Sequence, residues 1–276
     1  MIPRSKRQFE ASGRSLPTGP TAGFTDVHCH CLPGLDDGPS DRIKTLDLCR
    51  ALAADGIETV VATPHQLGRF EGCYDAGTIR DAVAELNGSL RDAGIPLTIL
   101  PGADVRLDER IPRLIETGDV LTVADRRRYL LLELPHEVFI DPQSLLPGLA
   151  SIGVAAILTH PERHVHLARN PGLVERWVEF DMCLQLTAGS FGGGFGQLSQ
   201  DAAWTFVCAP MPILVATDAH DTAGRSPRMS EAYRLLARRL GTDSARILCV
   251  ENPRRAVEGK ELLMLARDDM PREVIR

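Results

Sequence analysis

The sequence has no long apolar run, no excess of positive charge and few aromatic residues. None of its hydrophobic runs approaches the roughly 18 residues that a membrane-spanning helix needs, so we expect no membrane span. The formal net charge is −6, aromatic residues make up 5% of the chain, and no stripe of Lys and Arg is interleaved with them. Because nucleic-acid affinity depends mostly on neutralising phosphates, we expect no nucleic-acid partner.

The seven cysteines lack the pattern of a disulfide framework. Their number is odd, no C-x-x-C pair occurs, and most lie in apolar runs, as Cys49, Cys183, Cys208 and Cys249 do. These features favour reduced thiols in a cytoplasmic protein. The first 23 residues carry basic residues among Ser, Gly and Pro but lack the apolar core of a signal peptide, so we predict a disordered basic arm there.

The rest of the chain has the composition of one globular domain. The 276 residues are 43% hydrophobic and 25% charged, which fits a single α/β barrel. The sequence contains no internal repeat and no linker that would divide it. We therefore predict one domain over residues 24–266, followed by a charged, frayed tail over residues 267–276.

Seven short apolar, β-prone runs alternate with helix-length segments. The runs are residues 24–29, 57–62, 97–101, 129–134, 154–159, 182–186 and 213–217. Amphipathic periodicity predicts helices that begin at Ser40 or Asp41 and at Thr78, and four more over residues 145–152, 173–180, 198–208 and 232–240. This alternation predicts parallel β/α units, whereas the Gly-rich residues 189–196 predict a loop.

The stretch from Asp26 to Gly38 carries the first chemical signal. Its sequence, DVHCHCLPGLDDG, is typical of a β-strand that ends in a loop. Side chains alternate between the faces of a strand, so His28 and His30 point one way while the two cysteines beside them point the other. Two imidazoles on one face can bind one metal ion, although ordinary polar residues at a strand end explain H-x-H alone equally well.

Further histidines and acids follow most of the later β-prone runs. They are His65, Asp104, Glu133, His160, Asp218 and His220. In a parallel barrel these strand ends lie on one rim, where such folds place their chemistry, so we predict a shared site. Helix caps and core polar residues would not gather at strand ends in this way. His136, His164 and His166 lack this placement and are predicted to be exposed or packing residues.

Imidazole and carboxylate ligands without a cysteine suit zinc, manganese or iron. About nine ligands are too many for one tetrahedral ion, so two or three ions that share a bridging carboxylate are expected.

The motifs, in the order in which they occur along the chain, resemble those of the PHP (polymerase and histidinol phosphatase) superfamily. They are HCHCLPGLDDG from His28, TPH at His65, PG before Asp104, LELP around Glu133, HPER from His160, AGS up to Ser190 and DAH from Asp218.

More narrowly, these motifs look like those of the bacterial tyrosine phosphatases of capsule and exopolysaccharide loci, the CpsB/YwqE type. The resemblance covers nearly the whole chain from residue 24 and implies a distorted (β/α)7 TIM-like barrel, the PHP fold. It implies one ion held by His28, His30, Asp104 and Asp218, a second by Asp104, Glu133 and His160, and a third by Asp37, His65 and His220. Manganese is the expected metal, with iron or zinc as alternatives. Arg163 and Arg225 match positions that present arginines to the substrate phosphate.

Three positions depart from the family pattern. Asp104 stands where the family has a bridging glutamate, Gln66 where relatives often have a second histidine, and Thr187 where an asparagine is common. The Asp104 side chain is one methylene shorter than glutamate, which leaves open whether it spans two ions. Residues 189–196 would form either a lid or a flexible turn, and residues 66–77 would shape the entry for a peptide.

The expected reaction is hydrolysis of phosphotyrosine. Clustered cations lower the pKa of bound water, so that a metal hydroxide attacks phosphorus while Arg163 and Arg225 take up charge. A phenolate leaves readily because its conjugate acid has a pKa of about 10, and His65 or a bound water can supply a proton.

The expected partner is a bacterial tyrosine kinase that controls polysaccharide synthesis. Alternatives are a histidinol-phosphate-like small-molecule phosphatase, an exonuclease-like phosphodiesterase, or a non-catalytic regulator with an incomplete metal site. The oligomeric state is not predicted.

Overall fold

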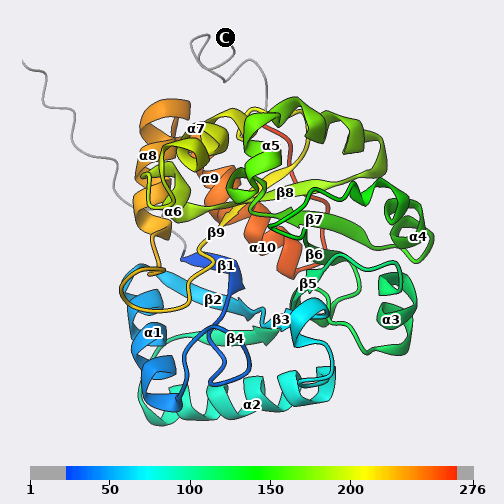
Figure 1. The fold of residues 1–276 in the computed structure, drawn as a ribbon. Helices are drawn as coiled ribbons and strands as arrows, with labels where there is room; N and C mark the ends of the chain where they lie inside the picture. The colour runs from blue at the N-terminus through cyan, green and yellow to red at the C-terminus, as the bar shows by residue number, and fades with distance from the viewer. Residues whose placement is uncertain (1–22, 266–276) are drawn as a thin grey trace, which may run out of the picture.

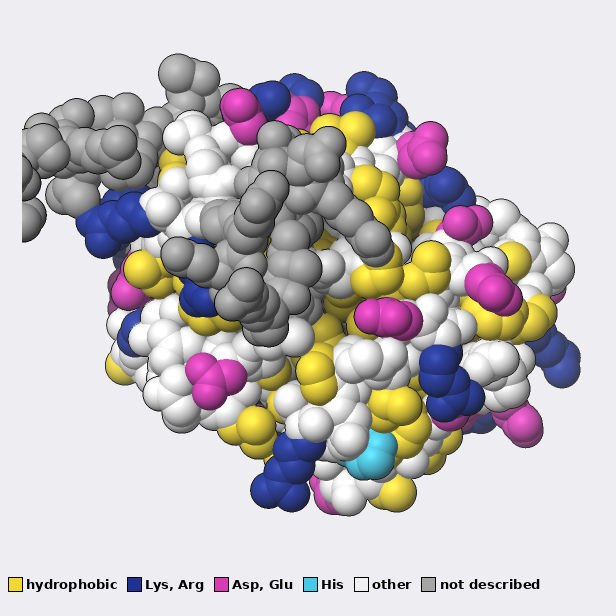
Figure 2. Space-filling view, turned by 90° about the horizontal axis from the view of Figure 1, so that it is seen from above, with side chains coloured by type: hydrophobic (Ala, Val, Ile, Leu, Met, Phe, Trp, Pro, Cys, Tyr) yellow, Lys and Arg dark blue, Asp and Glu magenta, His cyan; other side chains and the backbone are white. Residues whose placement is uncertain are grey.

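The structure is a computed structural model that describes residues 23–265 (Figure 1). The predicted basic arm, apart from Gly23, and the predicted tail lie outside these residues, so the domain limits at 24 and 266 stay predictions. None of the described helices is long and apolar enough to cross a membrane. On the described part of the face in Figure 2, basic and acidic side chains are interspersed, so this face offers a nucleic acid no stripe of positive charge.

Nine strands, all paired in parallel, form the centre of the described chain. They are β1 (Phe24–Cys29), β2 (Ile57–Ala62), β3 (His65–Gln66), β4 (Thr98–Pro101), β5 (Asp104–Arg106), β6 (Tyr129–Glu133), β7 (Ala155–Thr159), β8 (Cys183–Thr187) and β9 (Ile213–Ala216). One sheet has the order β1-β2-β4 and the other the order β3-β5-β6-β7-β8-β9.

The two sheets are parts of one ring of seven strands. β3 continues β2 after a break at Pro64, which has no N–H to donate, and β5 continues β4 after Gly102 and Ala103. The ring closes between the first and last strands, where Cys29 forms a parallel bridge with Ala219. The predicted α/β fold of seven β/α units is therefore confirmed. The sequence does not predict β3 and β5, because two and three residues are too few to show a period.

Ten α-helices accompany the strands in residues 23–265. They are α1 (Arg42–Ala54), α2 (Ala76–Asp92), α3 (Ile111–Thr117), α4 (Leu146–Ser151), α5 (Val165–Arg169), α6 (Ala188–Phe191), α7 (Gln197–Phe206), α8 (Met229–Leu240), α9 (Thr242–Arg246) and α10 (Asn252–Val257). Shorter segments are η1 (Gly68–Phe70), η2 (Val123–Asp125), η3 (Pro142–Ser144), η4 (Pro161–Arg163), η5 (Pro171–Phe180) and the π-helical η6 (Ile247–Glu251). The predicted helix over residues 173–180 is thus the 3₁₀ segment η5, and the predicted loop over residues 189–196 begins inside α6.

Two helix starts show the role of side-chain caps. α1 begins where the Asp41 carboxylate accepts a hydrogen bond from the Lys44 N–H at 3.0 Å, as predicted. α2 begins at Ala76 instead of Thr78. The reason is that Asp75 is the cap, and its carboxylate accepts a hydrogen bond from the Thr78 N–H at 2.7 Å.

Two apolar cores flank the strands. The larger core joins the strands to the helices around them, and Figure 1 shows α1, α2, α3, α4 and α8 on the outside. The smaller core fills the inside of the ring and combines Val27 and Leu131 of the strands with Ala256 of α10. Tyr129, the first residue of β6, donates a hydrogen bond to the Lys260 carbonyl at 2.9 Å. α10 and the residues after it therefore cover the amino ends of the strands, and the polar residues occupy the opposite ends.

Asp55 ties the first helix to α8, and its loss should destabilise the fold. Its carboxylate accepts hydrogen bonds from the Met229 and Ser230 N–H groups at 2.6 and 3.3 Å. Asp55→Ala should therefore lower the free energy of unfolding by about 1–2 kcal/mol, as for other lost helix caps. Chemical denaturation measures the change. The control is Asp47→Ala on the exposed face of α1, for which about 0.5 kcal/mol or less is expected. Equal effects of the two substitutions would contradict the role of Asp55.

Candidate metal centre

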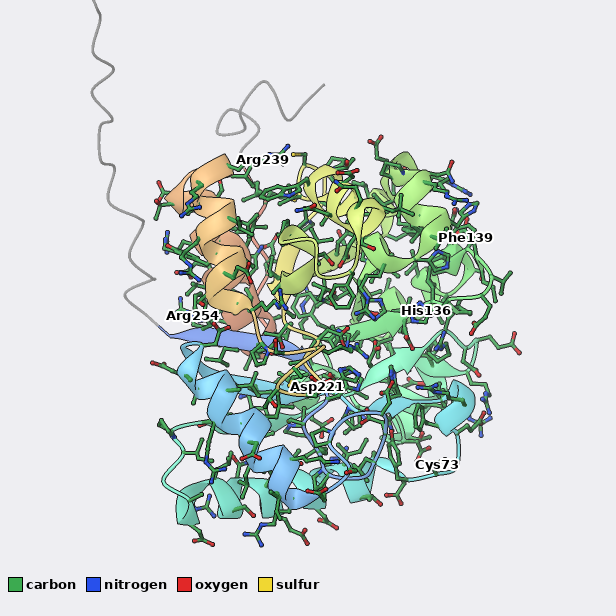
Figure 3. The ribbon with its side chains drawn as sticks, turned by 60° about the vertical axis from the view of Figure 1, so that its left-hand side comes forward. Cys73, His136, Phe139, Asp221, Arg239 and Arg254 are labelled. Atoms are coloured by element: carbon green, nitrogen blue, oxygen red, sulfur yellow. The ribbon has the colours of Figure 1, made fainter. Side chains whose placement is uncertain are left out.

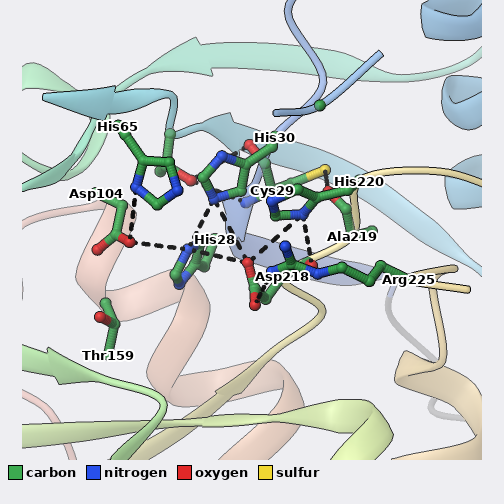
Figure 4. A network of polar contacts seen from close by, with 12 residues as sticks. His28, Cys29, His30, His65, Asp104, Thr159, Asp218, Ala219, His220 and Arg225 are labelled. Atoms are coloured by element: carbon green, nitrogen blue, oxygen red, sulfur yellow. Dashed lines mark hydrogen bonds and ion pairs between the residues drawn. The ribbon is translucent and has the colours of Figure 1, made fainter. Parts of the chain in front are cut away.

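Nine polar side chains meet at the carboxyl ends of the strands, most of them drawn in Figure 4. Their possible ligand atoms form four groups, within each of which all atoms lie within 4.8 Å of one another: His30-Asp37-His65-His220, His28-His30-Asp104, His28-His160-Asp218 and His65-Asp104-Glu133. These nine residues are the predicted ligands, and the described part of the chain adds no other member to the groups. The main difference from the predicted sets is that His65, not His160, is grouped with Asp104 and Glu133.

The first strand delivers two imidazoles. Nε2 of His28 and Nε2 of His30 lie 3.2 Å apart, so both rings face the cluster, as strand alternation predicts. The Cys29 thiol points away and donates to the Ala219 carbonyl at 3.5 Å, and Cys31 lies in the larger apolar core. The prediction that the cysteines turn away from the imidazoles is confirmed.

The loop after His30 folds back onto the site. Asp36 Oδ2 lies 2.5 Å from His30 Nδ1 and accepts a hydrogen bond from the His65 N–H at 3.2 Å. The close approach requires Gly38, because a Cβ there would lie 2.5 Å from the His30 carbonyl oxygen. Asp37 thereby reaches the cluster, with Oδ1 3.5 Å from His65 Nε2. Sequence analysis gave no role to Asp36, which orients the His30 ring.

Asp104 reaches the centre of the cluster although its side chain is shorter than glutamate. The residue is fully buried, and its Oδ2 lies 3.7 Å from His28 Nε2, 3.5 Å from His65 Nδ1 and 3.9 Å from His160 Nε2. One carboxylate oxygen therefore faces three imidazoles, because β5 begins at this residue and directs its side chain inward.

Two residues of the cluster have an unusual backbone. His160 and Asp218 have φ angles of 36° and 51°, in the left-handed region that non-glycine residues seldom adopt. Neighbouring strands hold them there. The Asp218 N–H donates to the His28 carbonyl at 2.8 Å, and the His160 N–H donates to the Gln185 carbonyl at 2.9 Å. Backbone strain of this kind is concentrated at functional sites.

Gln185 and Asp26 hydrogen-bond to residues at or next to the cluster, and neither role was predicted from the sequence. Gln185 Oε1 lies 2.8 Å from His28 Nδ1. An accepting oxygen there places the ring proton on Nδ1 and leaves Nε2 free as a ligand. Asp26 joins the first and last strands by accepting from the Thr217 N–H at 2.9 Å, and burial raises its pKa to about 6. A glutamine or aspartate inside an apolar strand is the signal that could have indicated them.

The imidazoles differ in charge. Burial lowers the pKa of His30 to about 3 and that of His160 well below its ordinary value, so both rings are neutral at pH 7 and keep a lone pair. His65 behaves in the opposite way. Burial alone would lower its pKa, but contacts with the Asp104 and Asp37 carboxylates outweigh burial and raise the pKa to about 11.

The buried carboxylates fit a site for cations. Burial would raise the pKa values of Asp104 and Asp218, but neighbouring side chains, His28 first, hold both below the ordinary range, so both are ionised. Within the described residues, neither oxygen of Asp104 and not Oδ1 of Asp218 has a hydrogen-bond partner. Ionised oxygens that lack a hydrogen-bond donor, together with imidazoles that keep a lone pair as those of His30 and His160 do, are the donor set that divalent metal ions bind.

The two predicted phosphate-binding arginines lie on the same cluster. Nη2 of Arg225 lies 2.5 Å from Asp218 Oδ2, a contact visible in Figure 4, and Nη1 of Arg163 contacts the same oxygen. Arg163 comes from η4, the turn that follows β7, and Arg225 from the loop after β9. Two distant segments therefore place their guanidinium groups side by side at the edge of the cluster.

Glu133 has two further neighbours that sequence analysis did not indicate. Nη2 of Arg106 lies 3.1 Å from Glu133 Oε2, and Nε2 of His136 lies 3.2 Å from Oε1. His136 is exposed, as predicted, yet it lies beside the site because it follows Glu133 by only three positions (Figure 3). His164 and His166 belong to none of the four groups.

Comparison with known proteins gives the family. The family model for capsular polysaccharide synthesis, CpsB/CapC, matches residues 24–258. The chain belongs to the CpsB/CapC family. The CpsB/YwqE type predicted from the sequence motifs is thereby confirmed.

Relatives within the CpsB/CapC family match over most of their length. Tyrosine-protein phosphatase YwqE of Bacillus subtilis is 32% identical over 242 residues, which are 87% of this chain and 91% of YwqE. Tyrosine-protein phosphatase CpsB of Streptococcus pneumoniae is 25% identical over 239 residues, 84% of this chain and 97% of CpsB. A crystal structure from work on these two metal-dependent tyrosine phosphatases matches with a TM-score of 0.81 at 30% identity, covering 87% of this chain and 96% of that chain.

Divalent ions should stabilise the folded protein. An ion present at about 100 times its Kd adds about 2.7 kcal/mol, so Mn²⁺ should raise the thermal midpoint of metal-stripped protein. Asp104→Asn should remove most of this gain. The control is Asp108→Asn, just beyond β5 and paired with Arg110, which should keep it. Scanning calorimetry with metal analysis of the same samples measures both effects, and an equal gain in the two variants would exclude Asp104 as a ligand.

Proposed function

We propose that this protein is a metal-dependent tyrosine phosphatase. The observation that carries the proposal is the cluster of nine imidazole and carboxylate side chains, with two arginines at its edge on the Asp218 carboxylate. In support, the relatives YwqE and CpsB are named tyrosine-protein phosphatases and are described as metal-dependent. The proposed substrate is phosphotyrosine in a protein.

The proposed cofactor is a set of two or three divalent ions, manganese first, with iron or zinc as alternatives. The four groups of side chains described above would hold them, and Asp104 is a member of two of these groups. When bound, such ions activate water and neutralise the charge of a phosphoryl group.

Arg163 and Arg225 would receive the substrate phosphate. Their donors converge on one oxygen of Asp218, so they can also converge on one phosphoryl group beside it. Guanidinium groups bind phosphoryl oxygens through charge-assisted hydrogen bonds, which strengthen as negative charge develops. The phenolate leaves with little acid catalysis, because a tyrosine hydroxyl has a pKa of about 10. His65, which is 13% exposed, or a bound water would supply the proton that the leaving group takes up.

A cleft beside the cluster has room for part of a polypeptide. Its volume is about 400 Å³, and it extends from Asp37 and His220 of the cluster to Lys44, Asp221 and Thr222. It would hold the residues next to the phosphotyrosine. As the protein substrate we propose a bacterial tyrosine kinase that controls polysaccharide synthesis. We also propose a cytoplasmic location, because all seven cysteines are free thiols.

Phosphate release from four substrates tests the proposal. The substrates are a phosphotyrosine peptide, a phosphoserine peptide, histidinol phosphate and a phosphodiester, each with manganese-loaded protein of measured metal content. We expect the phosphotyrosine peptide to have the highest kcat/KM. Preference for histidinol phosphate or for the diester would instead identify the corresponding alternative enzyme, and no turnover with fewer than two ions per chain would identify a non-catalytic regulator.

Loss of Arg225 should reduce transition-state stabilisation. Arg225→Met should lower kcat/KM on the phosphotyrosine peptide about 10²–10³-fold, the usual cost of removing one donor to a developing oxyanion. Arg254→Met is the control, because Arg254 is exposed and pairs with Glu251 far from the cluster, and it should leave kcat/KM unchanged. Steady-state kinetics measure both. A loss of less than about tenfold for Arg225→Met would remove this arginine from the mechanism.

A further inference from the structure

Residues 188–196, which are α6 and the rest of the Gly-rich residues 189–196, are hydrogen-bonded to the turn that carries Arg163. Glu162, which precedes Arg163, is fully buried and accepts hydrogen bonds from the Thr187 N–H at 2.9 Å and the Ser190 hydroxyl at 2.8 Å. The first four residues of the segment, which form α6, are all buried. The beginning of the segment therefore moves with η4, and it is neither a detached lid nor a flexible turn.

The end of this segment places an aromatic ring on the guanidinium group. The guanidinium carbon of Arg163 lies 4.4 Å from the centroid of the Phe195 ring, within the range of a cation–π contact. Two glycines allow this arrangement. A Cβ on Gly189 would lie 3.2 Å from Phe195 Cε2, and a Cβ on Gly194 would lie 3.0 Å from the Gly189 carbonyl oxygen, which already accepts the Gly194 N–H at 2.9 Å.

Arg163 and Arg225 both contact Asp218, whereas the Phe195 ring lies on Arg163. The Arg163 guanidinium also contacts Asp218. The same oxygen of Asp218 contacts Arg225, and the Asp218 carboxylate belongs to the candidate metal centre. Asp218 therefore contacts two arginines and the candidate metal ligands, whereas the Phe195 ring packs on the guanidinium plane of Arg163.

We propose that Phe195 is a positioning residue, which holds the Arg163 guanidinium in the orientation that receives the substrate phosphate. This rests on the proposed function only in that Arg163 binds phosphate. From the usual strength of a cation–π contact, we expect its loss to weaken phosphate binding about three- to tenfold. The Gly-rich segment is then a rigid support for Arg163, and the aromatic character of residue 195 matters more than its volume.

A spectroscopic test is independent of any activity. Arginine side-chain NMR should show the Nε–H resonance of Arg163 shifted upfield by the ring current of Phe195, with Arg163→Lys identifying the resonance by its loss. Phe195→Tyr should keep the shift, while Phe195→Leu and Phe195→Met should move the resonance to the position of an ordinary arginine. An unchanged resonance in both aliphatic variants would refute the contact.

Phosphate binding tests the consequence. Calorimetric titration of manganese-loaded protein with inorganic phosphate should show a Kd about three- to tenfold higher in Phe195→Leu and Phe195→Met, and unchanged in Phe195→Tyr. KM for a phosphotyrosine peptide should rise by the same factor, with kcat changed by less than about twofold. In an Arg163→Lys background, Phe195→Leu should have no further effect. An equal loss in that background would assign Phe195 a general structural role and overturn the proposal. Absence of turnover in the wild type would refute the phosphatase function but leave the NMR and phosphate titrations to decide the role of Phe195.

Discussion

At the centre of the molecule, oxygen and nitrogen lone pairs of mostly buried side chains face one another. Asp104 is the extreme case, a fully buried carboxylate with no hydrogen-bond donor among residues 23–265. An uncompensated buried charge costs several kcal/mol, and the neutral rings of His30 and His160 supply no positive charge to offset it. The neighbouring His28 and His65 side chains offset it in part and hold the pKa of Asp104 below its ordinary range. The donor set therefore fits cations, and the surrounding structure holds these donors in place.

The candidate ligands are held in place first by the strand ends and then by buried polar side chains. Strand ends set the position of each donor, because parallel strands in a ring all finish at the same rim. Buried polar side chains then set ring orientation, as Gln185 does for His28 and Asp36 does for His30. The unusual backbone angles at His160 and Asp218 belong to the same design, since hydrogen bonds between neighbouring strands maintain them. Sites with this support are more precise than sites built on loops alone.

Much of the fold and the positions of eight of the nine candidate ligands could be predicted from local rules in the sequence, whereas Asp37 was indicated only by the resemblance to the family. Apolar runs identify the strands, and a polar residue directly after such a run must lie at a strand end. The orienting residues could not be predicted in this way. Gln185 meets His28 across 157 positions, a contact that no local period records. Asp36 was indistinguishable from its neighbour Asp37, because loop geometry alone decides which of two adjacent carboxylates faces the imidazole nitrogen.

The bridge between Cys29 and Ala219 joins a strand that is synthesised early to a segment that is synthesised much later. On the ribosome, His28 and His30 emerge long before Asp218 and His220, so the complete set of donors does not exist until translation has passed β9. The two groups that include Asp218 or His220 are therefore completed only after most of the described chain has been made. A product of premature termination before residue 218 would lack part of the metal-ligand set and the strand contact that closes the ring, so more of its chain would be open to proteolysis.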